Sequence, residues 1–165
     1  MKRLSPKGIK ILKIIHLLFI VLWIGGALSL TLLAVLIQPE TAGGIYTKSL
    51  ILKVIDDFII IPGATGNLLI GFLYGLFTGW GFFKHIWVIV KWVMTVAQIL
   101  FGTFILGDFV NSNVILALEL GEKAVSNPEF MHNLSMSIAG GFIQLAGLLF
   151  MLCISVLKPW KKNLT

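Results

Sequence analysis

Two ionisable residues lie inside long apolar stretches of the chain, where their chemistry would suit cofactor binding. His16 is the first titratable residue after a basic amino-terminal cluster, and Lys91 lies about one helical turn into the third apolar stretch. Charged groups are costly in hydrocarbon and tend to mark functional sites in membrane proteins. Neutral imidazole is also the commonest protein ligand of metals, haem iron included. Two simpler interpretations stay open: Lys91 can extend to the lipid headgroups, and His16 can be a hydrogen-bonded packing residue.

Polar and small residues recur at helical spacing around these two positions. They form one face in three of the apolar stretches: His16, Trp23 and Leu30, with Gly26 close by, in the first; Lys91, Thr95, Gln98 and Gly102 in the third; Asn133, Ser137, Gly140, Gln144, Gly147 and Met151 in the fourth. Polar groups in hydrocarbon need partners, so we expect these faces to meet along a polar axis. In the second stretch, Gly71, Gly75 and Gly79 form a ladder of small residues that would let another helix approach closely.

A third candidate is His132, which begins the fourth apolar stretch at the opposite side from His16. We expect it to lie within hydrogen-bonding range of Asp56 or Asp57, which precede the second stretch. An ion pair or a residue at a helix start is one interpretation, and a second ligand site is the other. HExxH, Walker-loop, paired-cysteine and GxSxG motifs are absent from the sequence, which leaves metalloprotease, P-loop and serine-hydrolase functions without support.

The elements that carry these residues follow from the composition. Of the 165 residues, 58% are hydrophobic and 12% are charged, and the mean hydropathy is +0.99. Soluble domains carry about 25% charged residues, so lipid must be the solvent of this chain. A bilayer core about 30 Å thick needs roughly 20 apolar residues in a helix. Residues 14–37, 58–78, 86–107 and 130–157 qualify, and they predict an all-α protein: one domain over 1–165, a bundle of four transmembrane helices.

The connecting segments give further expectations. Residues 45–57 could form an amphipathic helix lying at the membrane interface before the second span, and residues 111–128 are expected to be a longer acidic loop. Pro62 is expected near the end of the second span, where a missing backbone donor is tolerated.

The basic residues are distributed asymmetrically between the two sides of the bundle. Ten lie on one side: Lys2, Arg3, Lys7, Lys10, Lys13, Lys84, Lys91, Lys158, Lys161 and Lys162. The other side has only Lys48, Lys53 and Lys123, together with all seven acidic residues. Because Lys and Arg concentrate in cytoplasmic segments, both termini are predicted to be cytoplasmic. The net charge of +6 then reflects topology and contact with the lipid bilayer, and no nucleic-acid partner is expected.

Two short motifs carry a resemblance to known families. The pattern His-x6-Trp-x-Gly-Gly at His16, Trp23 and Gly25-Gly26, followed by Trp87-x3-Lys91, resembles the HemJ type of protoporphyrinogen oxidase and the membrane domain of CopD copper-resistance proteins. A related family of four-span bacterial integral membrane proteins is similar over most of the chain, at Asp56-Asp57 and residues 81–85, 87–92 and 101–104. The HemJ likeness implies that His16 ligates haem b and that Lys91 is a second essential group. Residues 27–31 depart from the HemJ pattern because they lack its aromatic residues and arginine.

We therefore expect a haem b-binding protein of the bacterial cytoplasmic membrane, an oxidoreductase acting on a porphyrin or quinol. His16 would be an axial ligand of the haem iron, Lys91 would ligate the iron or pair with a propionate, and Trp23, Gly26 and Gln98 would complete the site. One alternative is a copper-handling or permeation protein, in which His16, Met94, Met151 and Cys153 would offer soft ligands. Another is an accessory subunit or homo-oligomer that associates through its glycine ladder.

Overall fold

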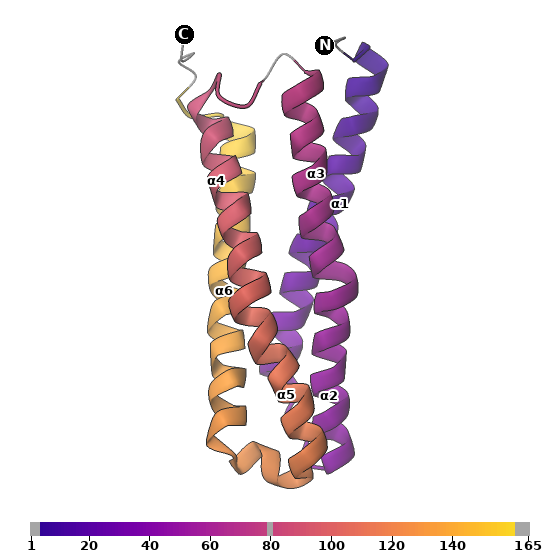
Figure 1. The fold of residues 1–165 in the computed structure, drawn as a ribbon, viewed down its shortest axis with the longest axis vertical. Helices are drawn as coiled ribbons and strands as arrows, with labels where there is room; N and C mark the ends of the chain where they lie inside the picture. The colour runs from indigo at the N-terminus through magenta and orange to yellow at the C-terminus, as the bar shows by residue number, and fades with distance from the viewer. Residues whose placement is uncertain (1–3, 79–80, 161–165) are drawn as a thin grey trace.

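The computed structural model describes residues 4–78 and 81–160, and nearly all of them are helical. The chain forms four long rods (Figure 1): α1 (Pro6–Leu36); α2 (Ala42–Ile55), η1 (Asp56–Ile60) and α3 (Ile61–Phe77); α4 (Ile86–Phe101), η2 (Gly102–Leu106), α5 (Gly107–Leu120) and η3 (Gly121–Ser126); and α6 (Pro128–Leu157). The described residues contain no strand. The predicted all-α bundle of four long helices is confirmed.

Local sequence signals set the ends of these rods. Ser5 caps α1 by accepting a hydrogen bond from the backbone N–H of Gly8, and Thr41 and Asn127 cap α2 and α6 in the same way. These polar caps satisfy backbone donors that the first turn of a helix leaves free. At the far end of α5, Gly121 has a φ of 56°, a conformation that suits glycine and ends the helix. The turns between rods therefore form where capping residues, glycine or proline occur.

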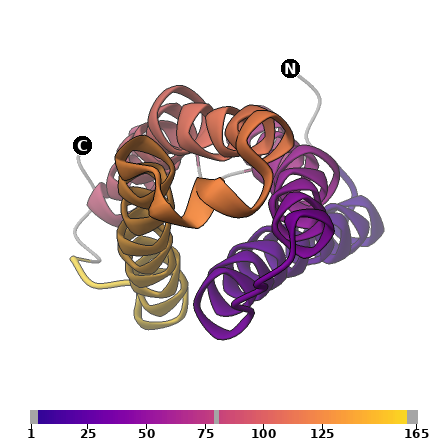
Figure 2. The same ribbon diagram turned by 90° about the horizontal axis from the view of Figure 1, so that it is seen from below.

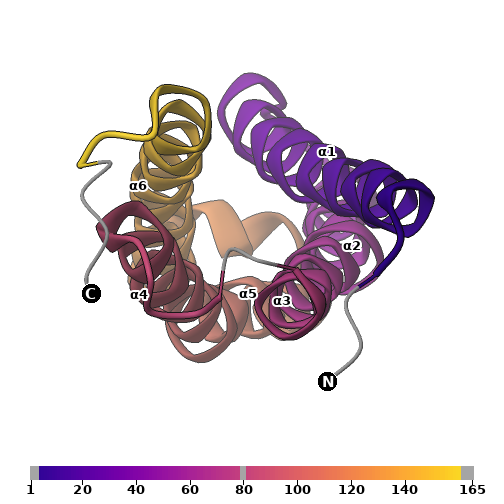
Figure 3. The same cartoon turned by 90° about the horizontal axis from the view of Figure 1, so that it is seen from above.

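The four rods surround a common axis, and each contacts two neighbours. α1 packs against α3 and α6, while α5 packs against α2 and α6. Seen from either end, α1 lies between the α2–α3 rod and α6, and the α4–α5 rod completes the ring (Figures 2 and 3). The start of α1, the end of α3, the start of α4 and the end of α6 lie together at the top of Figure 1.

Charge divides the bundle into two ends. The top end in Figure 1 carries Lys7, Lys10, Lys13, Lys84, Lys91 and Lys158, and it is called the basic end below. The acidic residues belong to the other half, here the acidic end. Lys2, Arg3, Lys161, Lys162 and Gly79, which also entered the expectations above, lie outside the described residues. The structure thus separates the charges as the sequence predicts.

Polarity is inverted relative to a water-soluble bundle. Large apolar side chains point outward along every rod, including Leu18, Val21, Leu69, Val93, Phe104 and Val156. Asn67, Thr95, Gln98, Asn113, Asn133 and Gln144 are buried instead. Water would penalise such an apolar surface, whereas lipid accommodates it. Each rod is long and apolar enough to cross a bilayer, and the chain is a multi-pass membrane protein.

The rods are longer than the predicted spans, which corrects two expectations. The second and third rods contain 36 and 41 residues, or roughly 50–60 Å at 1.5 Å per residue, against a bilayer core of about 30 Å. Residues 45–57 do not form a separate interfacial helix, because they continue into α3 and pack beside α5. The expected loop at 111–128 is largely helical. Helices continue beyond the apolar residues because charged side chains do not interrupt them, whereas Gly121 and Pro128 do.

Two π-helical turns interrupt the long rods. The first π turn, Asp56–Ile60, immediately precedes Ile61 and Pro62. A proline inside a helix lacks a donor and clashes with the carbonyl group four residues earlier, so the wider turn accommodates it. Pro62 was expected at the end of a helix and instead lies within a continuous rod. The second π turn, Gly102–Leu106, is bounded by Gly102 and Gly107, which tolerate unusual helical geometry.

Glycine allows the closest contact between rods, although not at the expected ladder. A Cβ atom on Gly63 of α3 would lie 2.7 Å from the backbone nitrogen of Trp23 in α1. At the ladder, a Cβ atom on Gly75 would collide with the ring of Phe82, and one on Gly71 would touch Trp92 at 3.9 Å. The described part of the ladder therefore accommodates aromatic rings of its own chain.

Candidate functional site

The predicted polar faces of α4 and α6 meet along the bundle axis. Gln98 Nε2 donates to the backbone oxygen of Gln144 at 3.1 Å, and Gln144 Nε2 donates to the backbone oxygen of Gln98 at 3.3 Å. One turn toward the basic end, Thr95 Oγ1 donates to Met151 Sδ at 3.5 Å. Such pairing satisfies polar groups that lipid could not. The predicted meeting of polar faces is confirmed for α4 and α6, which the two glutamines join.

His16 lies on this axis near the basic end. Its ring meets Tyr74 of α3 edge-on, with the ring centroids 5.7 Å apart. The Nδ1 atom of His16 is buried and has no hydrogen-bond partner. Leaving a polar atom buried and unpaired is unfavourable, and native proteins do so rarely. The interpretation of His16 as a hydrogen-bonded packing residue therefore has no support at this nitrogen.

Lys91 approaches the same region from α4. Its ammonium group donates to Ser155 Oγ of α6 at 2.5 Å, so the side chain is directed toward α6. It is also near enough to His16 to act on it electrostatically. The structure thus brings together, from α1 and α4, the two ionisable residues that the sequence singled out.

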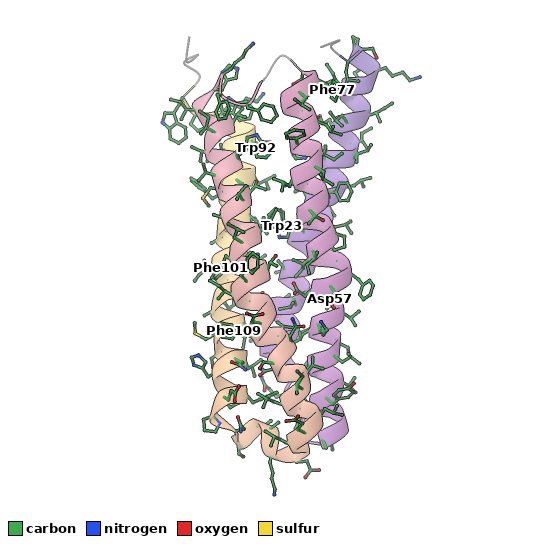
Figure 4. The ribbon with its side chains drawn as sticks, in the orientation of Figure 1. Trp23, Asp57, Phe77, Trp92, Phe101 and Phe109 are labelled. Carbon is green, nitrogen blue, oxygen red and sulfur yellow. The ribbon has the colours of Figure 1, made fainter. Side chains whose placement is uncertain are left out.

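The rods separate around His16 and Lys91. α3 contributes no buried residue between Leu68 and Phe77, and the described part of α4 contributes none before Thr95. From above, α1 with α3 and α4 with α6 form two pairs (Figure 3). Trp92 points from α4 toward α3, and its ring meets that of Phe82 (Figure 4). The basic half of α3 and of α4 therefore contributes little to the buried core.

The other residues expected around a cofactor lie deeper in the bundle. Trp23 is only 1% exposed and packs against Gly63. A Cβ atom on Gly26 would lie 2.8 Å from Ile60, so that glycine is enclosed by the second rod. Gln98 is hydrogen-bonded to Gln144. In the structure these three residues pack rods together, and they are not grouped with His16 and Lys91.

The expected contact between His132 and the aspartates is absent. His132 is exposed on α6, and its ring meets Phe109 of α5 edge-on at 6.0 Å. Asp57 forms an ion pair with Lys53 at 2.9 Å, and among the described residues no ion pair joins His132 to Asp56 or Asp57. The prediction fails because Phe130 and Asn133, rather than His132, face the interior at this end of α6.

Metal binding by side chains alone has little support. In the part of the chain that the structure describes, no three His, Cys, Asp or Glu residues are grouped so that they could hold a metal ion. Among the soft ligands considered for copper, Cys153 is exposed on the outer surface of α6, and Met151 accepts a hydrogen bond from Thr95. The structure does not bring Cys153 to the axis that carries His16.

A cavity with polar groups in part of its lining lies in the acidic half and was not expected from the sequence. Both π turns border it, through Asp56 and Gly102, and it also touches Thr31 of α1 and Ser137 and Gln144 of α6. π-helical turns are rare and occur often at functional sites. The sequence signal was Pro62, which lies inside an otherwise uninterrupted helical pattern. The bundle therefore holds two separate polar regions, one around His16 and one around Asp56.

No protein-family model, curated protein or solved structure matches this chain. The class of the protein, a four-helix multi-pass membrane protein, comes from its own fold and surface. The likeness to HemJ and CopD depends on the short motifs at His16 and Lys91. Function is therefore argued from the chemistry of these residues.

Proposed function

We propose that this protein binds haem b at the basic end of the bundle and transfers electrons to or from a porphyrin or quinol. The observation that carries this proposal is the imidazole of His16, whose Nδ1 is buried without a partner, in the same half of the bundle as the cation of Lys91. A haem needs a ligand for its iron and a neutralising group for its carboxylates. His16 and Lys91 supply one of each from different helices.

The local chemistry fits this group. Imidazole is a common axial ligand of haem b, and an ammonium group pairs well with a propionate carboxylate. Tyr74 adds aromatic surface beside the imidazole, and Trp92 lies one residue after Lys91 in α4. The haem would supply one-electron chemistry, while the chain would hold its iron, neutralise a propionate and limit water access. Gln98 and Gln144, joined by two hydrogen bonds, would close the site toward the acidic end.

A spectrum of the purified wild-type protein tests this function. After expression with ample haem supply and purification in mild detergent, we expect a Soret band corresponding to one haem per chain. Stoichiometric copper without a Soret band would replace the proposal with a copper-handling function. Protein that carries neither group would contradict both and leave the accessory role.

We further propose that the basic end faces the cytoplasm of a bacterial cell, so that the haem site lies in the inner leaflet. The concentration of Lys7, Lys10, Lys13, Lys84 and Lys158 at that end supports this orientation. A reporter that is active only in the cytoplasm, fused after Thr165, is expected to be active. A second fusion within the turn between α1 and α2 is expected to be inactive. The reverse pattern would invert the orientation.

A further inference from the structure

The cavity between the two π turns has no role in the proposed haem site. Its volume is about 20 Å³, enough for one or two water molecules or a single small ion by the usual measure of about 10–15 Å³ per water. Five segments border it: α1, the first π turn, the second π turn, α5 through Val110, and α6. Apolar residues form most of its lining, and Thr31, Asp56, Ser137 and Gln144 bring polar groups to it. Buried polar groups are normally paired, so the polar part of this lining favours an occupant that can bind them.

Asp56 is the charged residue that borders this cavity. Its neighbour Asp57 takes Lys53 as an ion-pair partner at 2.9 Å, and the same Lys53 ammonium donates to Asn111 of α5. Among residues 4–78 and 81–160, no basic side chain forms an ion pair with Asp56. A carboxylate inside a bundle of this kind needs a compensating positive charge. The two adjacent aspartates therefore differ: Asp57 is in direct contact with the Lys53 ammonium group, whereas Asp56 forms no ion pair with it.

Ser137 provides a second, independent indication of a ligand. Its side chain is 5% exposed and borders the cavity, and its Oγ atom is buried without a hydrogen-bond partner. A buried hydroxyl without a partner is unfavourable unless something occupies the space beside it. Thr31 adds a second oxygen to the lining, and its own proton is donated to the backbone oxygen of Ala27 at 2.8 Å. Its lone pairs can still accept a cation.

Glycines keep the space between these oxygens open. A Cβ atom on Gly141 would collide with Thr31 Oγ1, and one on Gly107 would lie 4.0 Å from Asp56 Oδ2. The second π turn begins at Gly102, where a Cβ atom would lie 2.8 Å from the side-chain nitrogen of Gln144. Irregular helical segments in membrane proteins can supply backbone oxygens to Na⁺.

We propose that this cavity binds one monovalent metal cation, Na⁺, through the carboxylate of Asp56 and the hydroxyl oxygens of Ser137 and Thr31. The donors are all oxygen atoms, as hard cations require. One carboxylate balances one positive charge, whereas Ca²⁺ and Mg²⁺ sites usually supply more charge or retain several waters. The size of the cavity matches one dehydrated ion.

A second cavity, bordered by Lys48, Ser49 and Asn113, shares Ser137 with the first and lies beyond it toward the acidic end. The ammonium group of Lys48 is held by the backbone oxygen of Ala34 at 3.0 Å, whereas Asn113 Oδ1 is buried and unpaired. On the other side, Gln98 and Gln144 bind each other and close the axis.

Binding of radioactive Na⁺ to the purified full-length protein tests this site. Wild-type protein is expected to bind one Na⁺ per chain saturably, and to unfold at higher temperature in NaCl than in choline chloride of equal ionic strength. Asp56→Asn should abolish both effects, because it removes the charge while keeping the shape. Asp57→Asn is the matched control and should preserve them, since Asp57 already has Lys53 as its partner. Ser137→Ala should weaken Na⁺ affinity about tenfold.

Several results would overturn the site. One is a wild-type protein that binds no Na⁺ at a pH where its carboxyl groups are ionised. Another is thermal stability that responds to pH and not to Na⁺, since the occupant would then be a proton. Equal losses in Asp56→Asn and Asp57→Asn would show that neither carboxylate has a specific role. If Asp56→Asn fails to fold, Na⁺ binding by wild type and by Ser137→Ala still decides the question.

Discussion

Replacing His16 with alanine is expected to eliminate the Soret band of the purified protein while leaving the bundle folded. The iron would lose its axial ligand from α1, and Lys91 alone would offer only a charge contact. Folding should persist because the tightly packed contacts lie elsewhere, at Trp23, Gly63 and the Gln98–Gln144 pair. Absorption spectra, haem content and circular dichroism of the same samples measure both outcomes. His132→Ala is the matched control, because His132 is exposed and meets only a ring edge of Phe109 in α5.

Lys91→Met extends this test to the second residue. It keeps the length of the side chain and removes the charge, so haem affinity should fall about tenfold or more through loss of a charge-assisted contact. Insertion into the membrane should be unaffected, because the methionine side chain is apolar. An unchanged Soret band in His16→Ala protein would refute the haem site. Loss of haem from His132→Ala as well would assign the effect to general damage.

The sequence predicted the architecture because lipid imposes simple requirements on it. Long apolar runs must be helical, and the lysines that precede α1 and follow α6 place those ends together. The polar faces of α4 and α6 were also predictable, because buried amides such as Gln98 and Gln144 need partners and found each other.

The ends of the helices were less predictable, for a physical reason. Hydropathy marks where a helix enters lipid, not where its hydrogen bonding stops. The apolar stretches end at three aspartates, yet the helical hydrogen bonding continues through them: Asp56, Asp57 and Asp108. Only Gly121 and the Asn127-Pro128 pair interrupt the backbone in the acidic half of α5 and α6.

The rotation of each helix about its own axis determines which of the predicted site residues point into the bundle. His16 and Lys91 belong to regular stripes, and each side chain is directed into the bundle. His132 lies at the first turns of α6, where no stripe fixed its direction, and it points outward. Asp56 is the first residue of the first π turn, and it borders the cavity on the axis. The π turn changes the direction of the side chains around it, and a sequence pattern that assumes 3.6 residues per turn does not reveal this change.

The expected ladder at Gly71 and Gly75 is not where two helix backbones come together. That contact is at Gly63, where an added Cβ atom would meet the backbone of α1. A ladder of glycines permits close packing but does not require it. Phe82 and Trp92, which fold back from the α3–α4 connection and from α4, occupy the space that the ladder offers. Gly63 faces the backbone of α1 instead, so its substitution should have the largest effect on packing.

Gly63→Ala is therefore expected to destabilise the folded bundle by about 1–3 kcal/mol, the usual cost of overpacking a tight core. Its added Cβ atom would lie 2.7 Å from the backbone nitrogen of Trp23, and backbone cannot move aside as a flexible side chain can. Gly25→Ala is the matched control on α1, because a Cβ atom there has nothing within 4 Å. It should change stability by no more than about 0.5 kcal/mol. Titration of both variants and wild type from mild detergent into a denaturing detergent, followed by circular dichroism, measures the difference. Equal stability of the two variants would show that α1 and α3 are not in the close contact at Trp23 described here.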